Sequence, residues 1–226
     1  MFEKLFIITA ILTFLSMIVE GQEAKLNETA PDFVLKDVDG KEFKLSDLKG
    51  KAVVLEWINF DCPFVKKHYE SNNMQRLQAK YTEKGIVWLA ICSSAPGKQG
   101  HFSAEEIKKR TDNHKAKFTA YLIDEDGKVG KLYGAKTTPH MFIIDNNGTL
   151  VYAGAIDDKP TRDPKDIPNS LNYVSKALDE LLDGKKVSTQ SSQPYGCSVK
   201  YWLKTKILFY EIAVFFKAAF LLIYFF

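Results

Sequence analysis

Cys62 is the residue in this chain best placed for chemistry. It follows the apolar run 52–58 and precedes a segment with helical character, within Asp61-Cys62-Pro63-Phe64-Val65. At a strand-to-helix junction a sulfur meets unpaired backbone N–H groups and the positive end of the helix dipole, and both favour the thiolate. Pro63 supports this interpretation, since the first helical position tolerates the missing N–H of proline. The position predicts a nucleophilic thiol.

The other two cysteines have different settings. Cys92 ends a buried apolar strand, which predicts a packed, small hydrophobic side chain. Cys197 lies in the polar tract 193–198, whose glycine and proline forbid a regular helix and permit a mobile, returning arm. Such an arm could resolve a mixed disulfide or a sulfenate formed at Cys62; the alternative is a free or structural cysteine. Three cysteines are too few for a disulfide scaffold.

Glu56 interrupts an otherwise apolar strand ahead of Cys62. A carboxyl group desolvated there would have a raised pKa and could carry a proton to or from sulfur. The alternative is a solvated residue at a strand edge. The sequence leaves both interpretations open.

Basic residues and histidines near Cys62 give weaker signals. Lys66 and Lys67 are expected on a solvated helix face, and His68 on an exposed one. His140 is expected to point away from the cysteine, although its position could bring it into the same pocket. A Cys62/His140 pair lacks a third ligand, so we expect no metal and no cofactor.

Composition limits the class of protein. The chain has 226 residues, 46% hydrophobic and 26% charged, which suits one globular domain with terminal extensions. The net charge is +3, because 31 basic residues are scattered among 28 acidic ones. This balance argues against a nucleic-acid partner.

Strand and helix signals alternate from residue 30 onward. Asp39-Gly40 predicts a hairpin between strands near 33–35 and 42–45. Ser103 and Glu106 form a capping box that opens a helix toward residue 115. Further strands are predicted at 52–58, 86–91, 120–123, 141–145 and 149–153, and further helices at 63–84, interrupted near 71–73, and 170–183.

This order of elements resembles the thioredoxin fold. Thr137-Thr138-Pro139-His140 stands where thioredoxin-like folds carry a Thr-cis-Pro beside the reactive cysteine. We therefore expect an α/β, thioredoxin-like fold with a central mixed sheet flanked by helices and an N-terminal β-hairpin extension. The spacing also resembles Cys-x-x-Cys, with Val65 in place of the second cysteine, and Glu56 takes the position of the buried acid of thioredoxin.

Residues 29–201 resemble the peroxiredoxin-like family 1, an AhpC/TSA-type redoxin group. The resemblance rests on segments 30–35, 45–50, 62–66, 94–97 and 195–198. The peroxidatic Pro-x-x-x-Thr/Ser-x-x-Cys motif is absent, because Leu55 and Asn59 occupy its places before Cys62. The resemblance implies a thiol–disulfide oxidoreductase with Cys62 as nucleophile. Glu56 is the candidate proton shuttle, and Cys197, from its place in the arm, is the candidate resolving thiol.

The same resemblance implies a substrate-binding face formed by Pro63, Phe64, Thr138 and Pro139. The substrate would be a protein or small-molecule disulfide, and an unidentified thiol would act as reductant. Two alternatives stay open, namely a thiol-dependent peroxidase acting on a peroxide and a non-enzymatic thioredoxin-like module that binds extended polypeptide beside Pro139.

The two ends of the chain suggest export and membrane association. Residues 1–21 read as a signal peptide, with an uncleaved anchor as the alternative. The redoxin domain is predicted at 29–184 and the arm with Cys197 at 185–201. Residues 202–226 form a hydrophobic tail, read as a membrane-associating segment or as an appended extension; Glu211 and Lys217 oppose insertion. The expected location is periplasmic or extracellular.

Overall fold

The computed structural model describes residues 23–202. The predicted signal peptide and the predicted hydrophobic tail beyond Trp202 lie outside the described residues. Within residues 23–202, no helix has the length and apolar character needed to cross a membrane.

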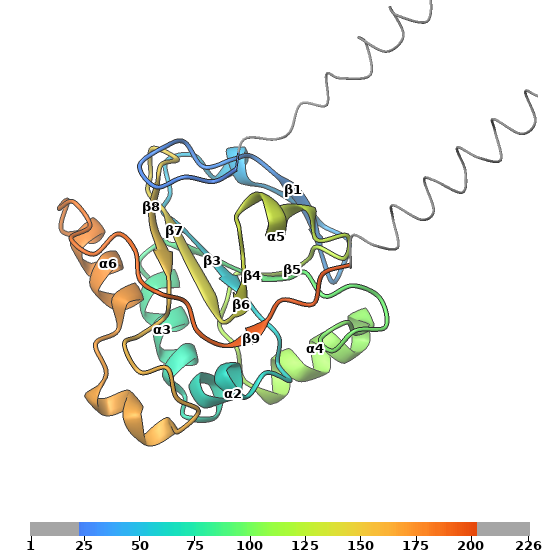
Figure 1. The fold of residues 1–226 in the computed structure, drawn as a ribbon. Helices are drawn as coiled ribbons and strands as arrows, with labels where there is room; N and C mark the ends of the chain where they lie inside the picture. Colours follow the sequence, from blue (N-terminus) through green and yellow to red (C-terminus); the bar gives the residue numbers. More distant parts are fainter. Residues whose placement is uncertain (1–22, 203–226) are drawn as a thin grey trace, which may run out of the picture.

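A seven-stranded mixed sheet forms the centre of the described region, in the order β2-β1-β5-β4-β3-β7-β8 (Figure 1). Strands β3, β4 and β5 run parallel, whereas β7 is antiparallel to β3 and the β1–β2 hairpin joins at one edge. The predicted mixed sheet and hairpin extension are thus confirmed. The strands are β1 (Val34–Asp37), β2 (Glu42–Lys44), β3 (Val53–Trp57), β4 (Val87–Cys92), β5 (Ala120–Ile123), β7 (His140–Ile144) and β8 (Leu150–Gly154).

Helices flank the sheet on both faces. The predicted interruption near residue 72 is confirmed, because Asn72 has φ of 57° and separates two helices. The predicted helix start at Ser103 is also confirmed, since Ser103 Oγ accepts a hydrogen bond from the Glu106 N–H; the Glu106 carboxylate pairs with Arg110 instead of completing a capping box. The helices are α2 (Pro63–Glu70), α3 (Asn73–Thr82), α4 (Ala104–Asn113), α5 (Lys128–Leu132) and α6 (Tyr173–Leu182), with 3-10 helices η1 (Leu45–Leu48) and η2 (Pro164–Asn169).

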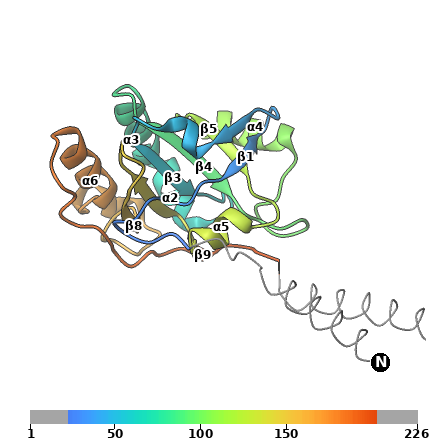
Figure 2. The ribbon, with the colours of Figure 1, turned by 90° about the horizontal axis from the view of Figure 1, so that it is seen from above.

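The two faces of the sheet bury separate cores. Alternate residues of a strand point to opposite faces, so Val54 packs in one core and Leu55 in the other. The first core lies beneath α2, α3, α4 and α6, and it contains Cys62. The second lies beneath η1, α5 and the segment around Phe33. Helices α6 and α4 lie toward opposite edges of the sheet (Figures 1 and 2).

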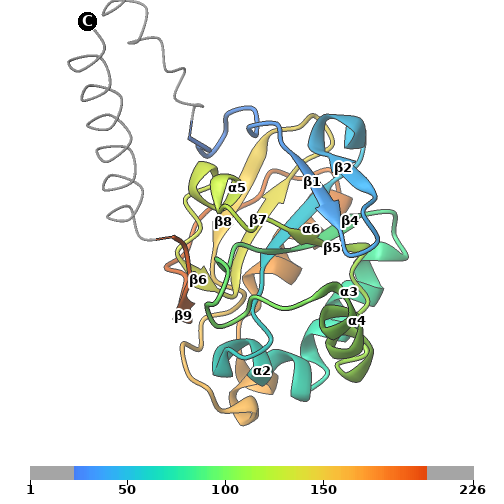
Figure 3. The same cartoon turned by 90° about the vertical axis from the view of Figure 1, so that its right-hand side faces the viewer.

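The chain beyond α6 returns across the protein and pairs with the core fold. Its short strand β9 (Cys197–Ser198) is antiparallel to β6 (Thr137–Thr138), and both views in Figures 1 and 3 place them side by side. Sequence patterns did not predict this pair, nor α5, η1 and η2. The predicted returning arm is present, but it is docked on the fold in the described structure.

Candidate active site

Cys62 is the N-cap residue of α2, with Pro63 in the first turn as predicted. Its side chain is 0% exposed and belongs to the core that contains Val65 and Tyr69. As a thiol it donates a hydrogen bond to the Thr138 carbonyl oxygen at 2.9 Å. Thr138 precedes Pro139 through a cis peptide bond, as expected. The structure therefore brings together Cys62, Thr138 and Pro139.

Cys197 completes this group. In the β6–β9 pair Cys197 is the direct partner of Thr138. The carbonyl oxygen of Thr138 also accepts the hydrogen bond from the Cys62 thiol. The preceding residue, Gly196, has φ of +142°, and a Cβ built on it would lie 2.1 Å from the Thr138 carbonyl oxygen. Only glycine permits this close approach of the two backbones.

The surroundings shift the pKa values of the two thiols in opposite directions. Burial raises the pKa of Cys62, but hydrogen bonds from Cys197, Thr138 and the backbone N–H groups of Cys197 and Val65 outweigh it and hold the pKa below its usual value. Burial and the neighbouring Cys62 sulfur raise the pKa of Cys197 to about 11. The arrangement suits a Cys62 thiolate that accepts a hydrogen bond from a protonated Cys197.

The Thr138 side chain adds to this environment. Its hydroxyl is buried and has no hydrogen-bond partner within the described residues. Its proximity to the sulfur contributes to the lowered pKa of Cys62. Thr138 thus serves the site through both its backbone and its side chain.

Glu56 is buried on a central strand, which excludes the strand-edge alternative. Its carboxylate accepts hydrogen bonds from Trp88 Nε1 at 2.7 Å, from the Tyr69 hydroxyl at 3.1 Å and from Gln78 Nε2 at 3.1 Å. Burial raises the pKa of Glu56 to about 7, although these three donors oppose the shift. No hydrogen bond described within residues 23–202 joins Glu56 to a cysteine; the two share the same face of the sheet.

A buried polar cluster holds the arm just before Cys197. The Tyr195 hydroxyl donates to Asp157 Oδ1 at 2.5 Å and lies 3.1 Å from His68 Nε2. Burial lowers the pKa of His68 to about 3, so the ring is neutral and its Nε2–H donates to Tyr195. Lys67 Nζ donates to the Lys159 carbonyl oxygen at 2.7 Å and lies 3.8 Å from Asp157 Oδ2. We refer to His68, Lys67, Asp157 and Tyr195 as the arm socket.

The arm socket corrects two predictions. Lys67 and His68 were expected on a solvated helix face, but they are 2% and 0% exposed. The reason is that the arm and the segment between β8 and α6 cover this part of α2. Lys66, in contrast, is exposed as predicted.

The residues of the arm that follow Cys197 are also held by hydrogen bonds. The Val199 N–H donates to the Lys136 carbonyl oxygen at 3.0 Å, and the Ala95 N–H donates to the Lys200 carbonyl oxygen at 2.9 Å. The Tyr201 hydroxyl donates to the Ala135 carbonyl oxygen at 2.8 Å. The ring of Tyr201 lies against Gly127 and Gly130, where any Cβ would clash with it. Cys197 therefore lies between two anchors.

The predicted substrate face is only partly accessible. Pro63 is exposed and Phe64 is half-buried, with its ring edge against Tyr195 at 5.8 Å between centroids. The Arg162 guanidinium lies 5.8 Å from the centre of the Phe64 ring. Thr138 is 4% exposed, because β9 covers it.

An ion pair fixes the loop ahead of Cys62. Arg110 Nη1 lies 2.7 Å from Asp61 Oδ1, and Arg110 Nε lies 2.7 Å from Glu106 Oε1. The Cys62 N–H donates to the Asn59 carbonyl oxygen at 2.9 Å. The sequence pattern does not predict these ion pairs, since Arg110 is 48 residues from Cys62 in the chain.

His140 and Cys92 have the roles that the sequence predicted. The His140 ring packs on Phe142, 4.4 Å between centroids, and Phe142 belongs to the core on the face opposite Cys62. Cys92 is 7% exposed and packs in the first core. Among the described residues, no three His, Cys, Asp or Glu side chains gather in a way that could hold a metal ion.

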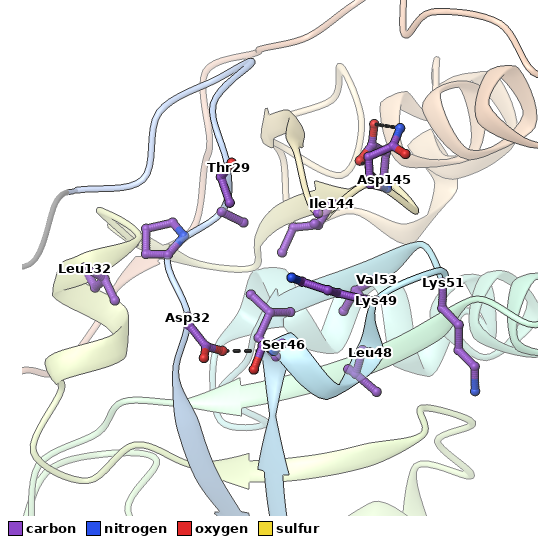
Figure 4. Close-up of a pocket in the computed structure, with 15 residues that line it drawn as sticks. Thr29, Asp32, Ser46, Leu48, Lys49, Lys51, Val53, Leu132, Ile144 and Asp145 are labelled. Carbon is purple, nitrogen blue, oxygen red and sulfur yellow. Dashed lines mark hydrogen bonds between the residues drawn. The ribbon is translucent and has the colours of Figure 1, made fainter.

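A hollow of about 660 Å³ lies at the other end of β3 (Figure 4). Its lining includes Asp32, Lys49 and Val53, and Val53 is the first residue of β3. Cys62 lies beyond the opposite end of that strand, five residues after Trp57. None of the predicted site residues lines it. Cys62 and Cys197 thus lie outside this hollow.

Comparisons with known proteins identify the family of the chain. Residues 26–153 match the model of the AhpC/TSA family, which is more than half of the chain. The chain belongs to the AhpC/TSA family. The thiol-disulfide oxidoreductase ResA of Bacillus thuringiensis subsp. konkukian is 31% identical over 130 residues, which cover 58% of this chain and 69% of that protein. The predicted redoxin resemblance is confirmed.

Solved structures support the fold over a longer part of the chain. An uncharacterized conserved protein from Geobacillus kaustophilus matches with a TM-score of 0.67 and 33% identity, covering 79% of this chain and 93% of that one. A hypothetical protein from Sinorhizobium meliloti 1021 matches with a TM-score of 0.67 and 28% identity, covering 80% and 97%. The chain has the thioredoxin-like α/β fold of this redoxin family.

Proposed function

We propose that this redoxin is a thiol–disulfide oxidoreductase in which Cys62 is the nucleophile and Cys197 the resolving thiol. The observation that carries the proposal is the contact of the two thiols beside the Thr138–Pro139 cis bond, with the pKa of Cys62 lowered and that of Cys197 raised. The activity agrees with that named for the ResA relatives. The substrate class is a protein or peptide disulfide, and the enzyme is returned to its dithiol form by an external thiol.

The reaction has two exchange steps. The Cys62 thiolate attacks one sulfur of the substrate disulfide, so that a mixed disulfide forms and one substrate thiolate leaves. The Cys197 thiolate then attacks the Cys62 sulfur, which forms the Cys62–Cys197 disulfide and releases the second substrate thiolate. The substrate gains two electrons and two protons, and the two cysteines lose them.

Glu56 is proposed to serve the proton balance of these steps. Cys197 must lose its proton before it can attack, and a carboxyl group with a pKa of about 7 exchanges protons readily near neutral pH. Its burial on the same face of the sheet as Cys62 supports the role. Pro63 and Phe64, beside the arm, are proposed to contact the substrate together with Thr138 and Pro139.

The proposed location is outside the cytoplasm, either periplasmic or extracellular. It rests on the signal-like residues 1–21, and association with a membrane through residues 202–226 is part of the same proposal. A disulfide between Cys62 and Cys197 would persist in such a compartment.

The decisive experiment follows the two cysteines through one turnover. The reduced protein is mixed with an oxidised model peptide, quenched in acid and mapped by mass spectrometry. We expect a Cys62–Cys197 disulfide in the native chain and a stable Cys62–peptide disulfide in Cys197→Ser. Recovery of Cys197 as a free thiol, with normal turnover in Cys197→Ser, would exclude its role.

Hydrogen peroxide in place of the peptide tests the alternative activity of the AhpC/TSA family. We expect slow consumption of peroxide in comparison with the disulfide. Faster turnover of peroxide through a Cys62 sulfenate would replace the proposal with a peroxidase. A folded protein that turns over neither substrate would indicate a binding module.

A further inference from the structure

We infer that the hollow at the start of β3 binds a small amphiphilic carboxylate, with the carboxylate on Lys49 and the hydrocarbon part against the apolar floor of the hollow. A medium-chain fatty acid has this chemistry. The hollow does not include Cys62 or Cys197, and the inference does not rest on the proposed redox function.

Side chains of the second core form the floor of the hollow. Leu45, Val53 and Ile144 are buried members of that core, and they also line the hollow. Leu48 and Leu132 are half-buried and add to its walls. The volume of about 660 Å³ lies within the range of about 300–1,000 Å³ that is typical of small-molecule sites. Hydrocarbon placed here would leave water and contact apolar side chains, which is favourable.

A tight turn fixes the backbone of Lys49 beside this floor. Lys49 has φ of −52° and ψ of 141°, and Gly50 has φ of +86°. The Lys51 N–H donates to the Leu48 carbonyl oxygen at 3.1 Å, which completes a type II turn. The Gly50 N–H donates to the Asn146 carbonyl oxygen at 3.0 Å, so the turn is also tied to the segment that follows β7.

Lys49 supplies a positive charge without a partner. Its side chain extends toward the middle of the residues that line the hollow, whereas the side chain of Lys51 lies at the edge and extends away from them (Figure 4). Among residues 23–202, no carboxylate lies within ion-pair distance of the Lys49 ammonium group. An anionic group in the hollow would therefore give Lys49 a charge-assisted hydrogen bond.

The two carboxylates that line the hollow already have donors. Asp32 Oδ1 accepts hydrogen bonds from two backbone N–H groups, at 3.0 and 2.9 Å, and Asp32 Oδ2 lies 3.9 Å from Lys44 Nζ. Asp145 Oδ1 likewise accepts from two backbone N–H groups, at 2.9 and 2.8 Å, and Asp145 Oδ2 accepts from Asn147 Nδ2 at 3.4 Å. The charge that still lacks a partner in the hollow is thus the positive charge of Lys49.

These features select the class of ligand. A cationic amphiphile would be repelled by Lys49, and a neutral alcohol would lack the charge assistance of a carboxylate. The floor residues are apolar, so a second polar group on the ligand would lose its hydrogen bonds to water there. One carboxylate joined to a hydrocarbon chain satisfies both conditions.

The experiment locates and measures binding at the same time. Decanoate is titrated into the full chain, isotope-labelled on the methyl groups of Ile, Leu and Val, and the methyl resonances are followed by NMR. We expect saturable shifts at Leu48, Val53 and Ile144, which line the hollow. Decanol and decyltrimethylammonium, which carry the same hydrocarbon chain, should bind more weakly than decanoate.

Variants of the two lysines test the role of the charge. Lys49→Gln should weaken binding of decanoate by roughly three- to tenfold, since the ion pair is partly exposed to solvent. Lys51→Gln is the matched control, and it should change the affinity by less than about twofold because its side chain points away from the hollow. Lys49→Glu should reverse the selectivity, so that decyltrimethylammonium binds more tightly than decanoate.

Several results would overturn the inference. Shifts that do not saturate, or shifts centred on residues outside the hollow, would exclude the site. Unchanged binding in Lys49→Gln, or an equal loss in Lys51→Gln, would exclude Lys49 as the anchor. Tighter binding of decanol or decyltrimethylammonium to the native chain would exclude a carboxylate ligand. Each of these results would leave the proposed exchange chemistry of Cys62 as it stands, because the binding measurement does not involve thiol exchange.

Discussion

Cys62 and Cys92 lie near the carboxyl ends of the neighbouring parallel strands β3 and β4, yet the two regions give the sulfur opposite surroundings. Cys92 is the last residue of β4, and its thiol donates to the Gly100 carbonyl oxygen at 3.4 Å within a packed core. Cys62 begins a helix and accepts hydrogen bonds from Cys197 and from backbone N–H groups. Burial is common to both cysteines, so it does not distinguish them. The hydrogen bonds that the sulfur receives do, and they are the reason for proposing Cys62 as the nucleophile.

The largest expected difference is in thiol exchange. Cys62→Ser should abolish reduction of an oxidised model peptide, because serine cannot form the mixed disulfide. Cys92→Ala should leave the exchange rate unchanged and lower the free energy of unfolding by about 1 kcal/mol through a small cavity. Stopped-flow exchange kinetics and urea unfolding measure the two effects. A large loss of exchange in Cys92→Ala would break the comparison.

The second difference is the docked arm, which brings Cys197 next to Cys62. Among the described residues, the thiol of Cys92 instead donates to the Gly100 carbonyl oxygen. Gly196→Ala places a Cβ in conflict with the Thr138 carbonyl oxygen, so the arm must move away from Cys62. We expect the equilibrium for the Cys62–Cys197 disulfide, measured against a glutathione redox buffer, to fall at least about tenfold, or roughly 1.4 kcal/mol.

Gly184→Ala is the matched control for this variant. Gly184 also has positive φ, at +69°, but a Cβ there meets nothing within 4 Å. Backbone strain should lower its stability without changing the disulfide equilibrium. Equal effects of the two variants would mean that strain, rather than arm displacement, explains the result at Gly196.

Glu56 lies on the strand that leads to Cys62, and its effect should depend on pH. The unfolded carboxyl group loses its proton near pH 4.5, whereas the folded one keeps it up to a pKa of about 7. The folded state therefore loses stability as pH rises through this window. Glu56→Gln removes this loss, so its stability relative to the native chain should rise by on the order of 3 kcal/mol between about pH 4 and pH 8.

Urea unfolding at several pH values measures this change, and exchange kinetics of the same variant test the proton role. We expect slower exchange in Glu56→Gln and loss of the step in its pH profile near 7. A difference in stability that is constant with pH would contradict the raised pKa. Unchanged kinetics at every pH would leave Glu56 with a structural role only.

The sequence predicted local features well and long-range contacts poorly. The place of Cys62 at the start of α2 followed from a strand, a proline and a helix start, all within one short segment. The burial of His68 and Lys67 could not be predicted, because the covering Asp157 and Tyr195 lie far away in the chain. One signal was present: Tyr195-Gly196-Cys197 places glycine next to the thiol, as a close backbone contact requires.

The smallest expected effect concerns the arm socket, which has no counterpart around Cys92. Tyr195→Phe removes the hydroxyl that donates to Asp157 and accepts from His68, but it keeps the ring against Phe64. The arm should stay on the protein with a looser hold on Cys197. We expect a severalfold weaker Cys62–Cys197 disulfide in the glutathione redox buffer and a severalfold slower resolution of a Cys62–peptide mixed disulfide.

Tyr133→Phe separates positioning from stability in this last test. Its hydroxyl donates to the Pro31 carbonyl oxygen at 2.6 Å, on the face of the sheet opposite Cys62, so it removes a similar hydrogen bond away from the arm. Tyr133→Phe should lose about 1 kcal/mol of unfolding free energy, and Tyr195→Phe about 1.5 to 3 kcal/mol, because its hydroxyl donates to a carboxylate. Only Tyr195→Phe should change the disulfide equilibrium, because Tyr195 lies two residues from Cys197 and Tyr133 lies on the opposite face of the sheet. If Tyr133→Phe changed the disulfide equilibrium by the same amount, the arm socket would only stabilise the fold and would not position Cys197.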